Sequence, residues 1–282
     1  MSTKSYNCYN KKAEIEVDPA GFIKSQFGTM NLMLKYLLEF KPEIFEDYLQ
    51  HLVDRIKKAI ESIEKKDGFY DFPDVDEEYE FMDKHPELRK LTRKFLLVHM
   101  NPMRKSKDSD KYLIYGYNHS MAFRRISYHR VKSLAEMIGK EEGLKLYSKI
   151  ITLYIEVLSK KNPQTDTISI SETRENQIKS WCEYSMADFT CRVLDEHKIL
   201  YRFDICFAHE VLKDFNDPDV AYYASCYAAD LPIWNNDRII HMRRQITLHH
   251  GDFCDELYWD SRHHKDPEQP SLDYIREMKE EK

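Results

Sequence analysis

The stretch IIHMRRQITLHHGDFCDELYW, residues 239–259, decides the fold that the sequence predicts. Residues 239–247 and 254–259 contain the β-branched and aromatic side chains that favour strands. Between them, His250, Gly251 and Asp252 form the short, glycine-containing connection that is typical of a tight turn. The stretch therefore predicts two antiparallel strands, with Cys254 at the start of the second.

The segments upstream predict helices first, and then strands mixed with helices. Apolar residues recur at helical spacing in residues 27–38, 44–63 and 86–98, and two helices joined around Gly139 are expected over residues 128–160. Residues 167–171 alternate apolar and polar as a half-buried strand does, and residues 177–182 are the expected partner strand. Further helices are expected from Ser185 to Leu194, over residues 201–213 and over residues 219–230.

This order of segments predicts the α+β class, with a helix-rich N-terminal part followed by a small antiparallel sheet packed with helices. The polar, proline-containing residues 101–111 are the expected boundary. We therefore expect a helical region at residues 1–105, an α+β domain at residues 106–266 and a charged, frayed tail at residues 267–282. The amphipathic N-terminal helices are candidates for pairing two copies into a homo-oligomer.

Composition argues against several classes of function. The 282 residues carry a formal net charge of −6, so no overall basic field attracts nucleic acid or an anionic membrane. Glycine numbers only 7 and no phosphate-binding glycine motif occurs, so no nucleotide or other cofactor is expected. The first twelve residues lack the apolar core of a secretory signal, and no apolar run is long enough to span a bilayer. The sequence thus predicts a cytoplasmic protein with reduced thiols and a small-molecule substrate.

Cysteines are the candidate reactive groups, because five of the six lie between Cys182 and Cys254. A thiolate is the best nucleophile that a side chain offers. Cys254 is the sharpest candidate, since it follows a glycine turn and is flanked by acidic residues; the alternative is a small buried hydrophobe at a strand end. The cysteines expected to pack on helices or to be incidental are Cys191, Cys206 and Cys8.

Two further pairs of residues suggest a binding or catalytic role. Cys226 and Asp230 stand four apart and would share a helix face, where the carboxylate either orients a partner or is only a surface group beside a buried thiol. Arg243 and Arg244 adjoin in a strand, so only one can face inward. An inward arginine suits a substrate carboxylate through its planar donor fork, and the alternative is an edge-strand charge.

Histidines near Cys254 raise the question of a zinc site. No C-x-x-C or H-E-x-x-H spacing occurs, and adjacent histidines in a strand point to opposite faces. The sequence therefore gives only weak support to a zinc site and none is predicted, and a metal-dependent enzyme is the third and least favoured hypothesis. The histidines concerned are His241, His249, His250, His263 and His264.

Three motifs in this order carry a resemblance to a known family: Trp181-Cys182, then Cys226-x-x-x-Asp230, then Arg244-x-x-Thr247-Leu248-x-x-Gly251-Asp252-x-Cys254-Asp255. Over residues 128–259 the chain resembles the L-2-amino-thiazoline-4-carboxylic acid hydrolase family. The final glycine-then-cysteine element also resembles the vinyl-reductase-like domains, which bind small ligands.

The resemblance to the hydrolases implies hydrolysis of a cyclic amidine-like C=N bond, which opens a thiazoline carboxylate to S-carbamoyl-cysteine or a near relative. It implies that Cys254 attacks the ring carbon, or lies against it while a water attacks, and that Asp230 or a histidine moves the proton. Arg244 would hold the substrate carboxylate, and backbone N–H groups at the glycine turn would stabilise the intermediate. The other resemblance implies a non-catalytic ligand-binding module, or a different reaction at the same cysteine. The implied catalytic residues are Cys254, Asp230, Cys226 and Asp252, and the implied substrate-binding residues are Arg244, Cys182, Gly251, Thr247 and His250.

Overall fold

The computed structural model describes residues 3–63, 75, 77–107, 111–161, 169–236 and 238–278. The chain divides into two compact units, and the α+β class is confirmed because strands and helices are packed in both. The first unit comprises Met1–Lys11, Ile155–Tyr222 and Cys226–Lys282, and the second comprises Lys12–Tyr154 and Tyr223–Ser225. The boundary expected near residue 105 falls inside the second unit.

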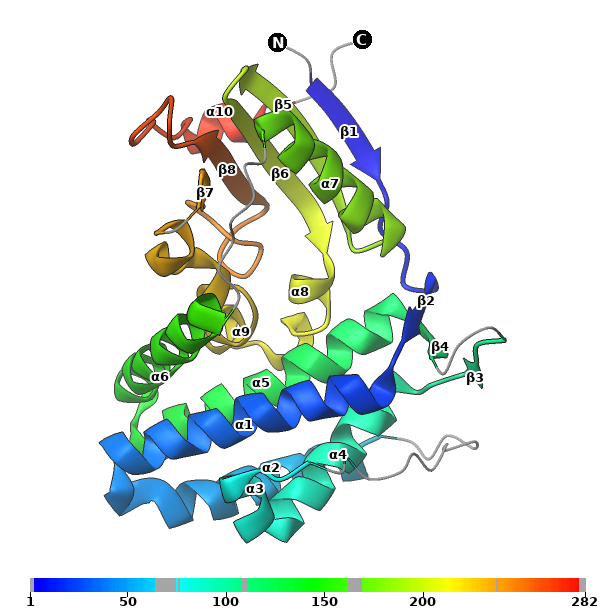
Figure 1. Cartoon of the computed structure of the whole chain (residues 1–282), viewed down its shortest axis with the longest axis vertical. Helices are drawn as coiled ribbons and strands as arrows, with labels where there is room; N and C mark the ends of the chain where they lie inside the picture. Colours follow the sequence, from blue (N-terminus) through cyan, green and yellow to red (C-terminus); the bar gives the residue numbers. More distant parts are fainter. Residues whose placement is uncertain are drawn as a thin grey trace. The chain divides into compact units, whose positions relative to one another are not determined.

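A five-stranded antiparallel sheet, in the order β1-β5-β6-β8-β7, forms the centre of the first unit (Figure 1). The two strands expected around the glycine turn are present, although the first ends earlier than predicted. The strands are β1 (Thr3–Asn7), β5 (Ala187–Asp195), β6 (Lys198–Cys206), β7 (Ile240–Arg243) and β8 (Cys254–Asp260).

Side chains alternate between the two faces of this sheet, and each face has its own cover. One face carries Phe189, Tyr201 and Phe203 and packs against α7 (Ile170–Glu183), which runs along the strands in Figure 1. The opposite face carries Leu200 and Trp259 among others and packs against the C-terminal residues. The remaining short helices of this unit are α8 (Phe207–Glu210), η2 (Lys213–Phe215), η3 (Tyr227–Asp230), η4 (Pro232–Asn235), α10 (Leu272–Arg276) and the part of α9 (Pro218–Ser225) up to Tyr222.

Helix α7 stands where the sequence predicted a pair of strands, and that prediction is wrong. Ser169 caps the helix in a reciprocal capping box with Glu172, which favours helix initiation at this point. Ile170, Ile178 and Trp181 then fall on one helical face and pack on the sheet. Residues 167–168 of the expected first strand lie outside the described residues.

Conversely, the helices expected from Ser185 and over residues 201–213 are strands β5 and β6, followed by the short α8. Ser185 has a positive φ of 52°, so it ends the turn after α7 and does not cap a new helix. Cys191 and Cys206 therefore lie on strands. The apolar positions of both segments fit a period of two residues, which is typical of strands, and the prediction of helices is wrong.

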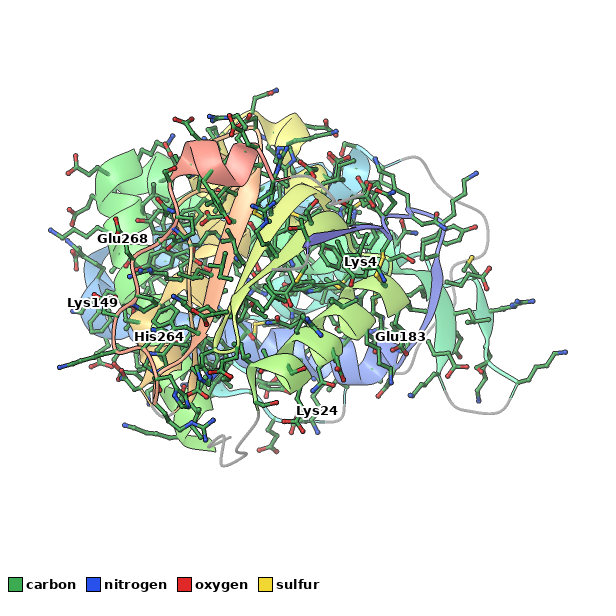
Figure 2. The ribbon with its side chains drawn as sticks, turned by 90° about the horizontal axis from the view of Figure 1, so that it is seen from above. Lys4, Lys24, Lys149, Glu183, His264 and Glu268 are labelled. Atoms are coloured by element: carbon green, nitrogen blue, oxygen red, sulfur yellow. A yellow bond between two sulfur atoms is a disulfide. The ribbon has the colours of Figure 1, made fainter. Side chains whose placement is uncertain are left out.

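The prediction of reduced, unpaired thiols at Cys8 and Cys182 is also wrong. The two residues form a disulfide, with Cα atoms 4.9 Å apart and 174 residues apart in sequence. The bond joins the segment after β1 to the last turn of α7. In Figure 2, the label Lys4 marks β1 and the label Glu183 marks the end of α7. Four cysteines remain as free thiols: Cys191, Cys206, Cys226 and Cys254.

Residues 271–278 are packed, in contrast to the frayed tail that the charge pattern predicted, and residues 279–282 of that tail lie outside the described residues. Ser271 caps α10 by accepting a hydrogen bond from the Tyr274 N–H. Ile275 and Met278 are buried against Leu200 and Phe253. Burial of these apolar side chains, together with the hydrogen bond from Arg202 to the Arg276 carbonyl, docks the segment on the sheet.

The second unit consists mainly of helices, and the helices predicted over residues 27–38, 44–63, 86–98 and 128–160 are confirmed. Gly139, with a φ of 88°, separates the last two as expected. A small sheet in the order β2-β4-β3 completes the unit. Its elements are β2 (Glu14–Val17), α1 (Pro19–Phe40), η1 (Pro42–Ile44), α2 (Phe45–Glu61), α3 (Glu80–Lys84), α4 (Pro86–Met100), β3 (Arg104–Lys105), β4 (Tyr112–Tyr115), α5 (Gly116–Ile138) and α6 (Lys140–Lys161), the last of these up to Tyr154.

Candidate functional site

A buried arginine, Arg244, lies at the centre of the candidate site in the first unit. It directly follows β7, and its side chain is only 7% exposed. One arm of the guanidinium donates to Asp230 Oδ1 at 2.7 Å, and the other arm donates to Glu256. One cation thus joins two carboxylates from different elements in a poorly solvated place, where such hydrogen bonds are strong.

Two phenol groups complete the hydrogen bonding of these carboxylates. The Tyr222 hydroxyl donates to Asp230 Oδ2 at 3.0 Å, and the Tyr258 hydroxyl donates to Glu256 Oε2 at 2.8 Å. Burial and the neighbouring carboxylates raise the pKa of both tyrosines, so they stay protonated donors. The result is a continuous chain of five polar side chains from Tyr222 to Tyr258.

The position of Arg244 is fixed by the backbone that follows it. The fully buried carboxylate of Asp255 accepts the N–H of Gln245 at 2.9 Å and that of Ile246 at 2.8 Å through one oxygen. Its second oxygen accepts from the Gln269 amide. Asp255 points to the sheet face opposite that of Cys254, so its role is to hold this segment against β8.

The Cys254 thiol lies beside the arginine network. Cys254 begins β8 and is 7% exposed, on the same sheet face as Glu256 and Tyr258. It interacts electrostatically with Arg244, Glu256 and Cys226. Burial raises the pKa of the Cys254 thiol well above its usual range, against the opposing effect of Arg244, so the group is a neutral thiol at neutral pH.

The Asp230 carboxyl is suited to proton transfer. Burial raises its pKa, although the Arg244 charge and the Tyr222 hydroxyl act in the opposite direction. A carboxyl whose pKa is raised takes up and releases a proton closer to neutral pH than an exposed aspartate does.

The structure brings together four residues that the sequence analysis selected from separate motifs. Cys226, Asp230, Arg244 and Cys254 all belong to the same network of contacts and electrostatic interactions. They come from the end of α9, from η3, from the segment after β7 and from the start of β8.

Two selected residues lie elsewhere. The Asp252 side chain is 64% exposed and accepts a hydrogen bond from Arg276, which lowers the pKa of the Asp252 carboxyl. Cys182 is bonded to Cys8 and offers no free thiol. Neither residue contributes a reactive group to the network around Arg244.

The turn before Cys254 has its own local interactions. Thr247 Oγ1 lies 3.4 Å from His250 Nδ1, and His250 Nε2 lies 3.1 Å from Asp219 Oδ1, so the imidazole ties this turn to α9. A side chain at Gly251 would begin 2.4 Å from Ile246 Cδ1. The absence of a side chain at Gly251 therefore leaves the space that the Ile246 side chain occupies.

Sequence reasoning missed Glu256, Tyr258 and Tyr222. The first two had a readable signal, because alternation in β8 places residues 254, 256 and 258 on one face. A glutamate on the same inward face as a buried cysteine calls for a cationic partner. Tyr222 gave no comparable signal.

One grouping of possible metal ligands occurs among the residues that the structure describes, namely His197, Asp260 and His263. Their donor atoms lie within 4.8 Å of one another. The His197 and His263 rings, however, stack in parallel with centroids 3.6 Å apart, and Arg262 donates to both Asp260 oxygens. Lone pairs that lie in two parallel ring planes do not converge on one ion, so this arrangement is a stacked histidine pair beside an ion pair.

Comparisons with protein families, with curated proteins and with solved structures found no match to this chain. Within the described ranges, no helix has both the length and the apolar character that crossing a membrane requires.

Proposed function

We propose that the chain is a small-molecule hydrolase that opens a cyclic C=N bond in an amino-acid-derived substrate. The observation that supports this proposal is the meeting of Cys226, Asp230, Arg244 and Cys254 in one network. These residues come from sequence-distant motifs that resemble those of the thiazoline carboxylate hydrolases.

The proposed reaction uses the Cys254 thiol as nucleophile and the carboxylates as proton carriers. Sγ forms a bond to the ring carbon while its proton passes through Glu256 or Asp230 to the ring nitrogen. The ring C–N bond then breaks and frees an amine. Water replaces the cysteine sulfur at that carbon, which yields the carbamoyl product and restores the thiol.

Arg244 receives a different role from the one that the resemblance implied. Both arms of its fork are occupied by Asp230 and Glu256, so we assign it to positioning these carboxylates and not to holding a substrate carboxylate. Its Nε–H makes no hydrogen bond to a residue that the structure describes, and this leaves one donor for a substrate or an intermediate.

The test is turnover of 2-amino-thiazoline-4-carboxylate by the full chain, with product detected by mass spectrometry, beside a panel of amidines and lactams. We expect Asp230→Asn to lower kcat by about 100-fold or more, as loss of a proton carrier does. Cys254→Ser should lower it further, because an alcohol ionises far less readily than a thiol. Asp204→Asn, a matched change at an exposed aspartate on β6, should leave kcat unchanged. Full turnover by Cys254→Ser would exclude the nucleophile role, and a wild-type protein inert to the whole panel would exclude the hydrolase.

A second candidate function, a ligand-binding module without catalysis, is favoured by the burial of Cys254 as a neutral thiol. Thiol alkylation at pH 7 distinguishes the two functions. One cysteine that reacts much faster than the others supports catalysis, whereas four uniformly slow thiols support the binding module.

A further inference from the structure

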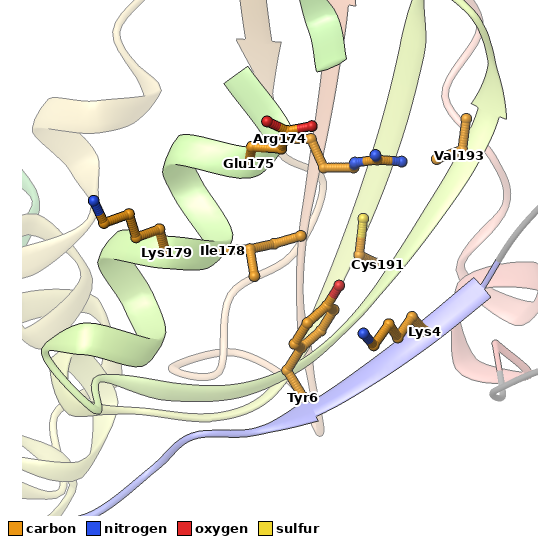
Figure 3. A pocket seen from close by; sticks show the side chains of 8 residues that line it. All are labelled: Lys4, Tyr6, Arg174, Glu175, Ile178, Lys179, Cys191 and Val193. Atoms are coloured by element: carbon orange, nitrogen blue, oxygen red, sulfur yellow. The ribbon is translucent and has the colours of Figure 1, made fainter. Parts of the chain in front are cut away.

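A cavity of about 490 Å³ opens in the first unit between α7 and the strands β1 and β5 (Figure 3). Its wall is largely apolar, with Tyr6 from β1, Ile178 from α7 and Val193 from β5. The volume lies within the range of small-molecule sites in proteins. The cavity is lined by none of the residues of the Arg244 network.

Arg174 and Lys4 are two cations of this cavity, whose lining also includes Lys179 and the carboxylate of Glu175. Neither Arg174 nor Lys4 forms a salt bridge to a residue in the described part of the chain. In Figure 3 the Arg174 guanidinium extends over the Cys191 thiol, and it also interacts electrostatically with that thiol. The Lys4 amine lies over the Tyr6 ring, 5.1 Å from its centroid. An arginine with an unused fork at the edge of an apolar cavity is a ready partner for a carboxylate.

A neutral thiol forms the floor beneath Arg174. Cys191 is buried, and burial raises the pKa of its thiol to about 11. Its register partner on β6 is Tyr201, whose fully buried hydroxyl interacts with this thiol and does not line the cavity. The floor therefore adds no negative charge that would repel an anion bound at Arg174.

We propose that this cavity binds a small aliphatic carboxylate, with its head group at Arg174 and Lys4 and its hydrocarbon chain against Tyr6, Ile178 and Val193. The lining carries three cations, Lys4, Arg174 and Lys179, against the single carboxylate of Glu175, so its net positive charge favours an anion, and the apolar wall favours a hydrocarbon body. The proposal does not rest on the hydrolase function, since it uses a different cavity and different residues.

The test is calorimetric titration of the full chain with octanoate, with octan-1-ol and octylammonium as probes of the same chain length. Octanoate should bind at least about 10-fold more tightly than octanol, and octylammonium should not bind. Arg174→Gln should weaken octanoate binding by about 10-fold or more, and Lys4→Gln should weaken it to a smaller degree.

Lys265→Gln is the control, because Lys265 is an exposed cation of the first unit that does not line the cavity. It should change octanoate affinity by less than about twofold. Equal losses in Arg174→Gln and Lys265→Gln would overturn the proposal by showing a non-specific charge effect. Equal binding of octanoate and octanol would overturn it as well, and so would absence of octanoate binding to the wild-type chain.

Discussion

At Arg244, a single guanidinium balances two largely buried carboxylates, so we expect its removal to lower the stability of the first unit. In Arg244→Met, Asp230 and Glu256 would remain buried without a cation. Breaking a buried ion pair in this way typically costs about 3–5 kcal/mol of unfolding free energy. Urea unfolding of the first unit, followed by tryptophan fluorescence, measures the change.

The control for Arg244→Met removes the charges of Asp230 and Glu256 together with that of Arg244. In the triple variant Arg244→Met, Asp230→Asn and Glu256→Gln no buried charge is left over, so part of the lost stability should return. If Arg244→Met unfolds at the same urea concentration as the wild type, Arg244 does not stabilise the protein by neutralising Asp230 and Glu256.

At Arg130, the same substitution should have the opposite effect. Arg130 is 1% exposed in the second unit, and its guanidinium donates to Gln26 Oε1 at 3.4 Å. No carboxylate among the described residues forms a salt bridge with it, and its other electrostatic neighbours are tyrosines. Replacement of a buried charge by a hydrophobic side chain of similar volume is often neutral or stabilising.

We therefore expect Arg130→Met to leave the unfolding free energy unchanged or to raise it by about 1–2 kcal/mol. Far-UV circular dichroism in urea measures this, with the exposed cation of Lys145→Met as the control for loss of charge alone. A loss of more than about 1 kcal/mol would show that Arg130 has a stabilising partner.

Strand β1 and helix α7 are connected by a disulfide close to their ends. The Cys8–Cys182 disulfide closes a long loop, with 174 residues of sequence separation. Such a bond stabilises mainly by restricting the unfolded chain, and its removal typically costs about 2–5 kcal/mol. Cys8→Ser with Cys182→Ser should lower the urea midpoint of the first unit accordingly.

The matched control for the disulfide variant is Cys206→Ser, which also replaces a cysteine but leaves the bond intact. Thiol titration of the denatured, unreduced wild type should find four free thiols. Six free thiols would contradict the disulfide, and in that case the double variant should unfold like the wild type.

Elements with a strong and regular period were predicted from the sequence, and elements with mixed signals were not. The long helices of the second unit have apolar stripes at helical spacing, and Gly139 marks their boundary. Residues 187–206 alternate apolar and polar side chains only over short stretches, which are interrupted by the polar and charged residues 195–198, so the period of two is hard to recognise in the sequence. Pairing with neighbouring strands decides such a segment, and a single sequence does not contain that information.

The same division applies to the candidate site. Cys226, Asp230 and Cys254 were selected because residue type and spacing alone point to reactive chemistry. Glu256 was not predicted, because the inward-facing Arg244 was expected to bind a substrate carboxylate and not a carboxylate of the protein. The role of Cys182 was predicted wrongly because its disulfide partner Cys8 lies 174 residues away in sequence, in the polar segment that follows β1.

At the scale of the whole molecule, the two units carry different spectroscopic probes. The chain contains three tryptophans, Trp181, Trp234 and Trp259, and all belong to the first unit. The long helices α1, α2, α4 and α5 belong to the second unit and dominate the far-UV circular dichroism. Each unit also has its own buried apolar core, so the unfolding of each can be followed separately in one sample.

Acid should act on the second unit through a buried histidine. Burial is the main cause that lowers the pKa of His129 to about 3, whereas an unfolded histidine titrates near 6.5. Below pH 6.5 the unfolded chain therefore binds a proton that the folded chain refuses, and stability is lost as the pH falls towards 3. At pH 4.5 this histidine alone should lower the unfolding free energy by about 2–3 kcal/mol relative to pH 7. The unfolding transition seen by circular dichroism should therefore move to lower urea concentration at pH 4.5, and His129→Leu should reduce this acid-dependent change. The transition seen by tryptophan fluorescence should respond to the disulfide variant and not to His129→Leu. An equal acid shift in His129→Leu and the wild type would show that His129 is not the group responsible.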